Sequence, residues 1–145
     1  MEPNITLEVS LSIAAPKSKV WKALIEPEMV KQYFFGTEMK STWKVGSPVT
    51  FSGEWEGKAY VDKGTVLQFE PEKILKYNYW SSMSGTEDVP ANYANITYAV
   101  EERNKETILT VTQDGHKSEE ARAHSEKNWL MILNDMKKLI EKVNH

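Results

Sequence analysis

Hydrophobic residues near the end of the chain recur at intervals of three and four positions. Between Ser118 and Val143 the repeating set is Trp129, Ile132, Leu133, Met136, Leu139, Ile140 and Val143. The helical period of about 3.6 residues places all of them on one side of an α-helix. The pattern therefore predicts one long amphipathic helix whose apolar face packs against another part of the molecule.

The earlier part of the chain shows mainly the alternation that is typical of strands. Residues 5–13 alternate between apolar and polar without interruption, which predicts a strand with one buried face. Two short helices are predicted next, the first with Pro16 in its opening turn and the second from Pro27 to Tyr33. Further strands are predicted around residues 49–55, 58–69, 74–80, 93–100 and 107–113.

Residues 58–69 contain a glycine in the middle of the predicted strand. Glycine at such a position often marks a β-bulge, and we expect one at Gly64. The alternation would place Thr65, Leu67 and Phe69 together on one face.

The order of the elements defines the fold class. Successive strands joined by short turns pair as antiparallel neighbours, and helices occur at only two places along the chain, which indicates an α+β fold. We expect a curved antiparallel sheet of about seven strands around the long C-terminal helix, with two short helices after the first strand. A length of 145 residues fits a single domain, 1–145.

Composition narrows the classes of function. The chain has no cysteine, which excludes disulfides, thiolate zinc sites and a cysteine nucleophile. Eighteen basic and twenty-one acidic residues give a net charge of −3, so nucleic-acid binding is not expected. No secretory signal follows Met1, and the longest apolar run, Trp129 to Leu133, cannot span a bilayer. We therefore expect a cytoplasmic protein.

Histidine, the usual acid–base residue, gives no clear catalytic signal. His116, His124 and His145 show no metal-ligand spacing with one another or with paired carboxylates. A phosphate-binding glycine loop, a nucleophile elbow and an HExxH motif are also absent from the sequence. We expect no metal, no cofactor and no catalytic residue, and we favour a non-enzymatic protein.

Aromatic residues are the strongest sign of a ligand site. The chain has five Trp, six Tyr and four Phe, and filling of the core would account for any one of them. A buried tyrosine hydroxyl, however, needs a hydrogen-bond partner. Tyr77, Tyr79 and Tyr98 on inward faces therefore indicate a roomy, partly wet pocket, in which they bond one another, Gln113, water or a ligand. The predicted ligand-binding residues are Phe51, Trp55, Tyr77, Tyr79, Tyr98, Trp129 and Leu133.

Two other segments are placed to close such a pocket. The chain has one extended polar loop, residues 81–90, and long loops in compact domains are often functional. Met83 in this loop, and Phe34 and Phe35 after the second short helix, are predicted at the mouth of the pocket.

A series of short motifs follows in order along nearly the whole chain. These motifs are Ile13-Ala14-Ala15-Pro16, Val20-Trp21-Lys22-Ala23-Leu24, Pro27-Glu28, Trp43-Lys44-Val45-Gly46-Ser47, Gly64-Thr65-Val66, Pro71, Leu75, Tyr77, Thr110-Val111-Thr112, and Trp129 with Leu133 and Lys137-Lys138-Leu139-Ile140-Glu141. Through them the chain resembles the START-like or SRPBCC superfamily. Within it the chain is similar to the AHSA-type branch, named for an activator of a heat-shock chaperone's ATPase. Asn128 is a departure, because relatives often carry glycine before the tryptophan.

The resemblance implies a helix-grip fold that holds an apolar ligand between the curved sheet and the last helix. Some branches of the superfamily add cyclase or dehydratase chemistry, and the chaperone-activator branch uses the fold as a protein-interaction domain. Three functions therefore stay open: a binding module for a small apolar or aromatic molecule, which we favour, a domain that acts on a chaperone, and an enzyme that uses a tyrosine or His116 as acid–base. The protein is expected to be a monomer or a homodimer.

Overall fold

The computed structural model describes residues 5–34, 36–81 and 86–143, and it confirms the α+β helix-grip fold. The elements, in chain order, are β1 (Ile5–Ile13), α1 (Lys17–Ile25), α2 (Pro27–Tyr33), β2 (Glu38–Ser41), β3 (Pro48–Trp55), β4 (Lys58–Glu70), β5 (Ile74–Tyr79), the 3-10 turn η1 (Pro90–Asn92), β6 (Ala94–Arg103), β7 (Glu106–His116) and α3 (Glu119–Val143).

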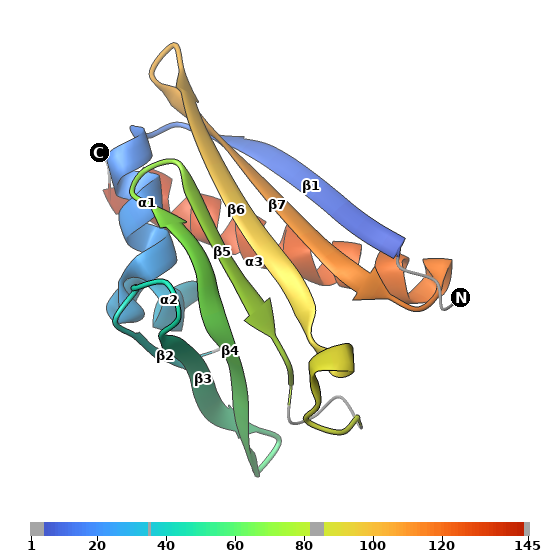
Figure 1. Cartoon of the computed structure of the whole chain (residues 1–145). Helices are drawn as coiled ribbons and strands as arrows, with labels where there is room; N and C mark the ends of the chain where they lie inside the picture. Colours follow the sequence, from blue (N-terminus) through green and yellow to red (C-terminus); the bar gives the residue numbers. More distant parts are fainter. Residues whose placement is uncertain (1–4, 35, 82–85, 144–145) are drawn as a thin grey trace.

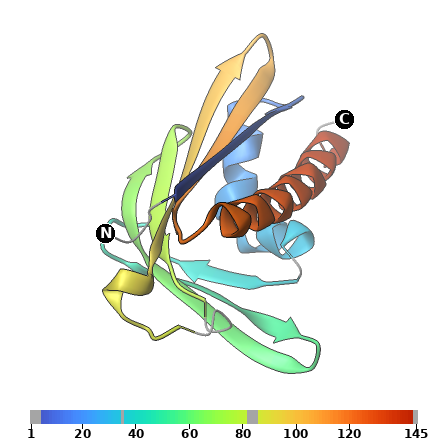
Figure 2. The ribbon, with the colours of Figure 1, turned by 90° about the vertical axis from the view of Figure 1, so that its right-hand side faces the viewer.

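The seven strands form one curved antiparallel sheet (Figure 1). Their order is β1-β7-β6-β5-β4-β3-β2, so consecutive strands from β2 to β7 are neighbours and β1 returns to pair with β7. All three α-helices lie on the same side of the sheet (Figure 2). The molecule therefore has an inner sheet face covered by helices and an outer face turned to solvent.

The long helix α3 packs on the inner face as its spacing predicts. The side chains of its apolar stripe that are buried in the core are Trp129, Ile132, Leu133, Met136 and Ile140. Its C-terminal half is also tied to the end of β1: Lys137 Nζ donates to the carbonyl of Ser12 at 2.6 Å, and Glu141 accepts from the backbone N–H of Ala14 at 2.8 Å. Apolar packing and these two hydrogen bonds together fix how the helix lies across the sheet.

Several boundaries differ from the sequence prediction. Pro16 lies just before α1 rather than in its first turn, because its backbone is extended, with ψ 155°. Strands β6 and β7 also continue past the predicted ends, to Arg103 and His116. Their added residues are mostly polar and exposed, and apolar alternation cannot detect such residues.

The bulge in β4 does not lie where the sequence predicts it. The pairing register between β4 and β5 shifts between Val66 and Gln68, so the extra residue is Leu67. Gly64 instead pairs in register with Val49 of β3. The prediction of a bulge at Gly64 was therefore wrong, and glycine is required there for a different reason, a close approach of the neighbouring backbone.

The bulge reverses the side to which alternate residues of β4 point. Asp62 and Val66 are buried, whereas Leu67 is 40% exposed. Beyond the bulge, Phe69 packs on the core. The prediction that Thr65, Leu67 and Phe69 share one face was therefore wrong, since an extra residue changes the alternation in the middle of the strand.

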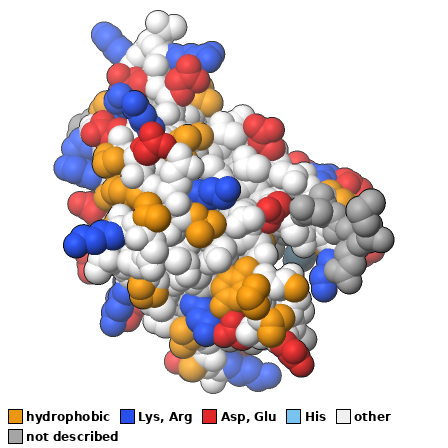
Figure 3. All heavy atoms as spheres, viewed as in Figure 1, with side chains coloured by type: hydrophobic (Ala, Val, Ile, Leu, Met, Phe, Trp, Pro, Cys, Tyr) orange, Lys and Arg blue, Asp and Glu red, His pale blue; other side chains and the backbone are white. Residues whose placement is uncertain are grey.

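The outer face of the sheet is a mixed polar surface. Lysine and arginine side chains are interspersed with acidic ones across it (Figure 3). Ion pairs between exposed side chains include Arg103 with Glu101, at 3.0 Å. Among the described residues, no helix has both the length and the apolar character needed to cross a bilayer.

Candidate functional site

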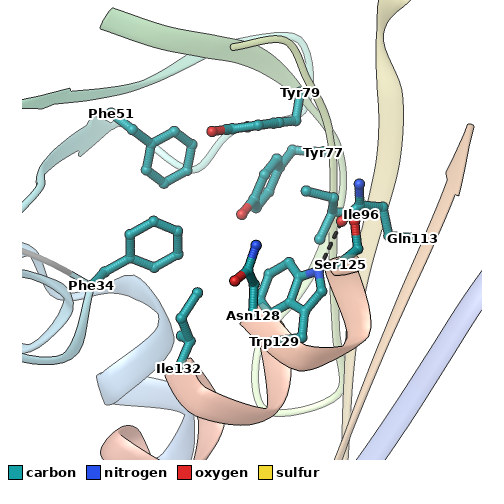
Figure 4. Close-up of a pocket in the computed structure, with 10 residues that line it drawn as sticks. All are labelled: Phe34, Phe51, Tyr77, Tyr79, Ile96, Gln113, Ser125, Asn128, Trp129 and Ile132. Atoms are coloured by element: carbon teal, nitrogen blue, oxygen red, sulfur yellow. Dashed lines mark hydrogen bonds between the residues drawn. The ribbon is translucent and has the colours of Figure 1, made fainter. Parts of the chain in front are cut away.

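A cavity of about 150 Å³ lies between α3 and the inner face of the sheet (Figure 4). Its walls come from the end of α2, from strands β3, β5, β6 and β7, and from one side of α3. The residues that line it are Phe34, Phe51, Tyr77, Tyr79, Ile96, Gln113, Ser125, Asn128, Trp129 and Ile132. Asn128 is exposed, so the cavity reaches the surface beside this residue.

Strand pairing brings the sheet side of the cavity together. Ile96 lies opposite Tyr77 across the β5–β6 pair and opposite Gln113 across the β6–β7 pair. These three residues form a row across neighbouring strands, all pointing to the inner face. Tyr79 lies two positions after Tyr77 on β5, and therefore on the same face.

The helix side of the cavity follows the helical period. Ser125, Asn128, Trp129 and Ile132 occupy positions i, i+3, i+4 and i+7 on α3. The apolar spacing identified Trp129 and Ile132 as members of the stripe. It missed Ser125 and Asn128, although extending the same spacing by one turn toward the N-terminus would have found both.

The structure brings together most of the predicted lining residues. Phe51, Tyr77, Tyr79 and Trp129 line the cavity, and so does Phe34, which was predicted at its mouth. Tyr98 and Leu133 are buried in the core and are not among the lining residues. The side chain of Trp55, together with Phe35 and Met83, lies outside the residues that the structure describes.

Hydrogen bonds between side chains stabilise the walls of the cavity. The hydroxyls of Tyr77 and Tyr98 lie 3.0 Å apart and bond each other, which is one of the pairings that the sequence left open. Trp129 Nε1 donates to Gln113 Oε1 at 2.8 Å, which joins α3 to β7. The Tyr98 ring meets the Trp129 indole edge-on, with centroids 5.9 Å apart. Both walls are thus held by paired polar groups and by ring contacts.

Tyr79 has a partner that the sequence did not predict. Its hydroxyl donates to the carboxylate of Asp62 at 2.5 Å, and Ser81 Oγ donates to the same carboxylate at 2.9 Å. Asp62 is only 8% exposed and lies behind the cavity wall on β4. Its inward direction depends on the bulge in β4, so the carboxylate could not be assigned to the inner face from alternation alone.

The tyrosines of the site remain protonated at neutral pH. Burial raises the pKa of Tyr77 well above its ordinary value near 10. Burial raises the pKa of Tyr98 to about 12, partly offset by its hydrogen bond with Tyr77. Burial, and then the hydrogen bond to Asp62, raises the pKa of Tyr79. The lining tyrosines therefore present neutral hydroxyls to the cavity.

These pKa shifts predict lower stability in alkaline solution. Burial holds the pKa of Tyr98 at about 12 in the folded protein, against about 10 once the chain unfolds. Between the two values the unfolded chain loses the proton first, so stability is full below pH 10 and falls as pH rises toward 12. The loss should reach about 1.4 kcal/mol per pH unit for each such tyrosine. Urea denaturation from about pH 9 to about pH 11 would measure the decline. Tyr98→Phe should reduce the slope by the share of one tyrosine, and an unchanged slope would contradict the assignment.

Neither His116 nor His124 is among the residues that line the cavity. His116 Nδ1 lies 3.0 Å from the carbonyl oxygen of Ile5, at the end of β7. His124 is exposed on α3, and His145 lies outside the described residues. No group of three or more potential metal ligands occurs within the described part of the chain. The cavity thus offers phenol, amide and hydroxyl groups rather than a histidine or a metal site.

Comparisons with known proteins agree with this architecture. The profile of the family described as Activator of Hsp90 ATPase homolog 1-like protein matches residues 14–141. A comparison with curated protein sequences gives no match.

Several solved structures are similar to this chain. ChR145 from Cytophaga hutchinsonii has 43% sequence identity and a TM-score of 0.87, with 100% of both chains covered. The Aha1 dimer from Colwellia psychrerythraea has 18% identity and a TM-score of 0.74, covering 94% of this chain and 96% of that chain. DynU16, a protein of the dynemicin biosynthetic locus, has 19% identity and a TM-score of 0.79, covering 96% of this chain but 48% of its own. The last two show a shared fold alone.

Proposed function

We propose that this chain, which belongs to the family of Activator of Hsp90 ATPase homolog 1-like proteins, binds a small neutral aromatic or apolar molecule between α3 and the sheet. The observation that carries the proposal is the cavity of about 150 Å³ on the inner face. Its walls are mostly aromatic and aliphatic, and the hydroxyls of Tyr77 and Tyr79 in these walls have hydrogen-bond partners. This combination is typical of ligand sites.

The size of the cavity favours a ligand of one or two rings. An apolar protein cavity of about 150 Å³ accepts benzene. The opening beside Asn128 leaves space for a second ring to extend toward solvent.

The existing ring contacts favour an aromatic ligand. Phe34 and Phe51 stack with centroids 6.3 Å apart, and Phe51 meets Tyr79 edge-on at 5.7 Å. Offset and edge-on contacts of this kind are the favourable arrangements between rings. A planar ring in the cavity would continue the same cluster.

The lining also favours a neutral ligand. No Lys, Arg, Asp or Glu is among the lining residues that the structure describes. An ion placed there would lose its hydration without gaining a charged partner in the wall, and this costs several kcal/mol. A neutral ring avoids that cost and gains from burial of its apolar surface.

Contact with a chaperone, the role that the family description names, would depend on a different part of the molecule. Such a contact requires exposed apolar surface. On α3, Leu130 and Met131 are 41% and 46% exposed. These two neighbouring side chains point away from the cavity, so binding of a small ligand and contact with a protein would use separate surfaces.

Blocking the cavity should weaken ligand binding. We expect naphthalene to shift the NMR signals of the backbone amides of β5 and α3, because one of its rings fits the cavity. Ile132→Trp would place a second indole in that space and should weaken binding by about tenfold or more. Leu130→Trp, on the exposed side of the same helix, is the matched control and should bind as the wild type does. Absence of any shift with naphthalene, or equal binding by the two variants, would reject the proposal.

A further inference from the structure

We infer that Asp62 fixes the hydroxyl of Tyr79 as a hydrogen-bond acceptor toward the cavity, so that the site selects aromatic molecules carrying a hydroxyl. The inference rests on the proposed ligand function and specifies the chemistry of the ligand. Asp62 would act as a positioning residue, because it lies behind the wall and reaches the ligand only through Tyr79.

The hydroxyl hydrogen of Tyr79 is already used in the hydrogen bond to Asp62. A phenol has one O–H donor and two acceptor lone pairs, whereas a carboxylate has acceptors only. With Tyr79 Oη 2.5 Å from Asp62 Oδ2, the hydrogen has to lie between the two oxygens. If it turned into the cavity, lone pairs on both oxygens would face each other at this short distance. The hydrogen bond therefore has a single direction, from Tyr79 to Asp62.

The neighbouring tyrosine pair has no such fixed direction. In the bond between Tyr77 and Tyr98, either hydroxyl could be the donor. Tyr77 can therefore offer a ligand an acceptor or a donor by reversing this bond. Tyr79 cannot, because its partner has no hydrogen to give. The two tyrosines on the same face of β5 thus have different roles, and Tyr79 imposes the stricter requirement.

Tyr79 Oη keeps an acceptor lone pair beyond its hydrogen bonds with Asp62 and Ser81, and Tyr79 lines the cavity. Its hydroxyl end points toward the region between Phe51 and Tyr77 (Figure 4). A ligand hydroxyl placed there would donate to Tyr79 Oη. An ether oxygen at the same place has no hydrogen to donate, so two acceptor oxygens would face each other. A carboxylate would in addition be repelled by the buried charge of Asp62. The geometry therefore favours a neutral hydroxyarene over its ether or its carboxylic acid analogue.

A matched pair of ligands tests this selectivity at neutral pH, where 2-naphthol is un-ionised. 2-Naphthol and 2-methoxynaphthalene share the same rings, but only 2-naphthol has an O–H group that can donate a hydrogen bond. We expect the wild type to bind 2-naphthol about tenfold more tightly, as measured by NMR or fluorescence titration. Equal binding of the two would overturn the inference and leave the ligand function standing. Binding of neither, nor of naphthalene, would reject the ligand function itself.

Variants test whether the preference for 2-naphthol arises at Tyr79 and Asp62. Tyr79→Phe should still bind both molecules, but the ratio of its affinity for 2-naphthol to its affinity for 2-methoxynaphthalene should fall to about one. In Asp62→Asn the hydrogen bond from Ser81 to Oδ1 keeps the amide oxygen on the Ser81 side, so the NH2 group faces Tyr79 and donates to it. Tyr79 then turns its own hydrogen into the cavity, and 2-methoxynaphthalene should bind more tightly than it binds the wild type. Leu130→Ala, on the exposed side of α3, is the control and should keep the wild-type preference. A merely structural role would weaken both ligands equally, so the ratio of their affinities is the deciding measurement.

Two results would overturn the role of Asp62. One is an unchanged preference in folded Asp62→Asn, and the other is an unchanged preference in Tyr79→Phe. If Asp62→Asn fails to fold, Tyr79→Phe alone decides whether the preference arises at this hydroxyl.

Discussion

Replacing Trp129 with alanine is expected to lower the free energy of unfolding by about 3–5 kcal/mol, as for other large aromatic side chains of protein cores. Trp129 is 7% exposed, and its indole meets the ring of Tyr98 edge-on. The change removes these contacts and opens a hole between α3 and the sheet. It also deprives Gln113 Oε1 of its 2.8 Å hydrogen bond, which adds to the loss.

Such a loss would be a large part of the stability of a typical domain, which is about 5–15 kcal/mol. Chemical denaturation followed by circular dichroism would measure it. Leu130→Ala is the matched control, because this residue is next in sequence but 41% exposed on the other side of the helix. It should cost no more than about 0.5 kcal/mol. Similar midpoints for Trp129→Ala and the wild type would mean that α3 is not anchored through this residue.

The long helix and the aromatic half of the site were predictable from the sequence. The apolar stripe of α3 extends over several turns, and a helical period that is regular over this length is a strong indication of a helix. Tyr77 and Tyr79 follow a simple alternation on β5, a strand without a bulge between Ile74 and Tyr79. Where one hydrophobic period continues along a whole helix or strand, it predicts which side of that element each residue lies on.

Asp62 could not be predicted in the same way, although it holds Tyr79. The face to which it points depends on the register of β4, and the extra residue at Leu67 changes that register. A bulge is set by how two strands pair across the sheet, so it leaves little trace in the local order of apolar residues. Ser125 and Asn128 were missed for another reason: they are polar residues that continue an apolar stripe at the open end of a cavity.

Gly64→Ala is expected to cost about 3 kcal/mol or more, above the usual range for overpacking. A Cβ atom at Gly64 would lie 1.6 Å from the carbonyl oxygen of Asn78 and 2.6 Å from its carbonyl carbon. Both are backbone atoms of β5, so they cannot move aside alone. The strand would have to shift, and the hydrogen bond from the backbone N–H of Thr65 to Asn78 Oδ1, 2.7 Å long, would be strained or lost.

The shift would also reach the ligand site, because Tyr77 and Tyr79 flank Asn78 on β5. We therefore expect Gly64→Ala to weaken naphthalene binding as well as stability, even though residue 64 does not line the cavity. Gly53→Ala on β3 is the matched control. Its added Cβ meets the hydroxyl oxygen of Tyr60 at 2.7 Å, and a side chain can shift where a paired backbone cannot, at the cost of the hydrogen bond between Tyr60 and Thr37. That variant should lose about 1 kcal/mol. Equal losses for the two glycines, measured by urea denaturation, would show that β5 yields to the new methyl group and that the close approach at Gly64 is not what maintains the cavity wall.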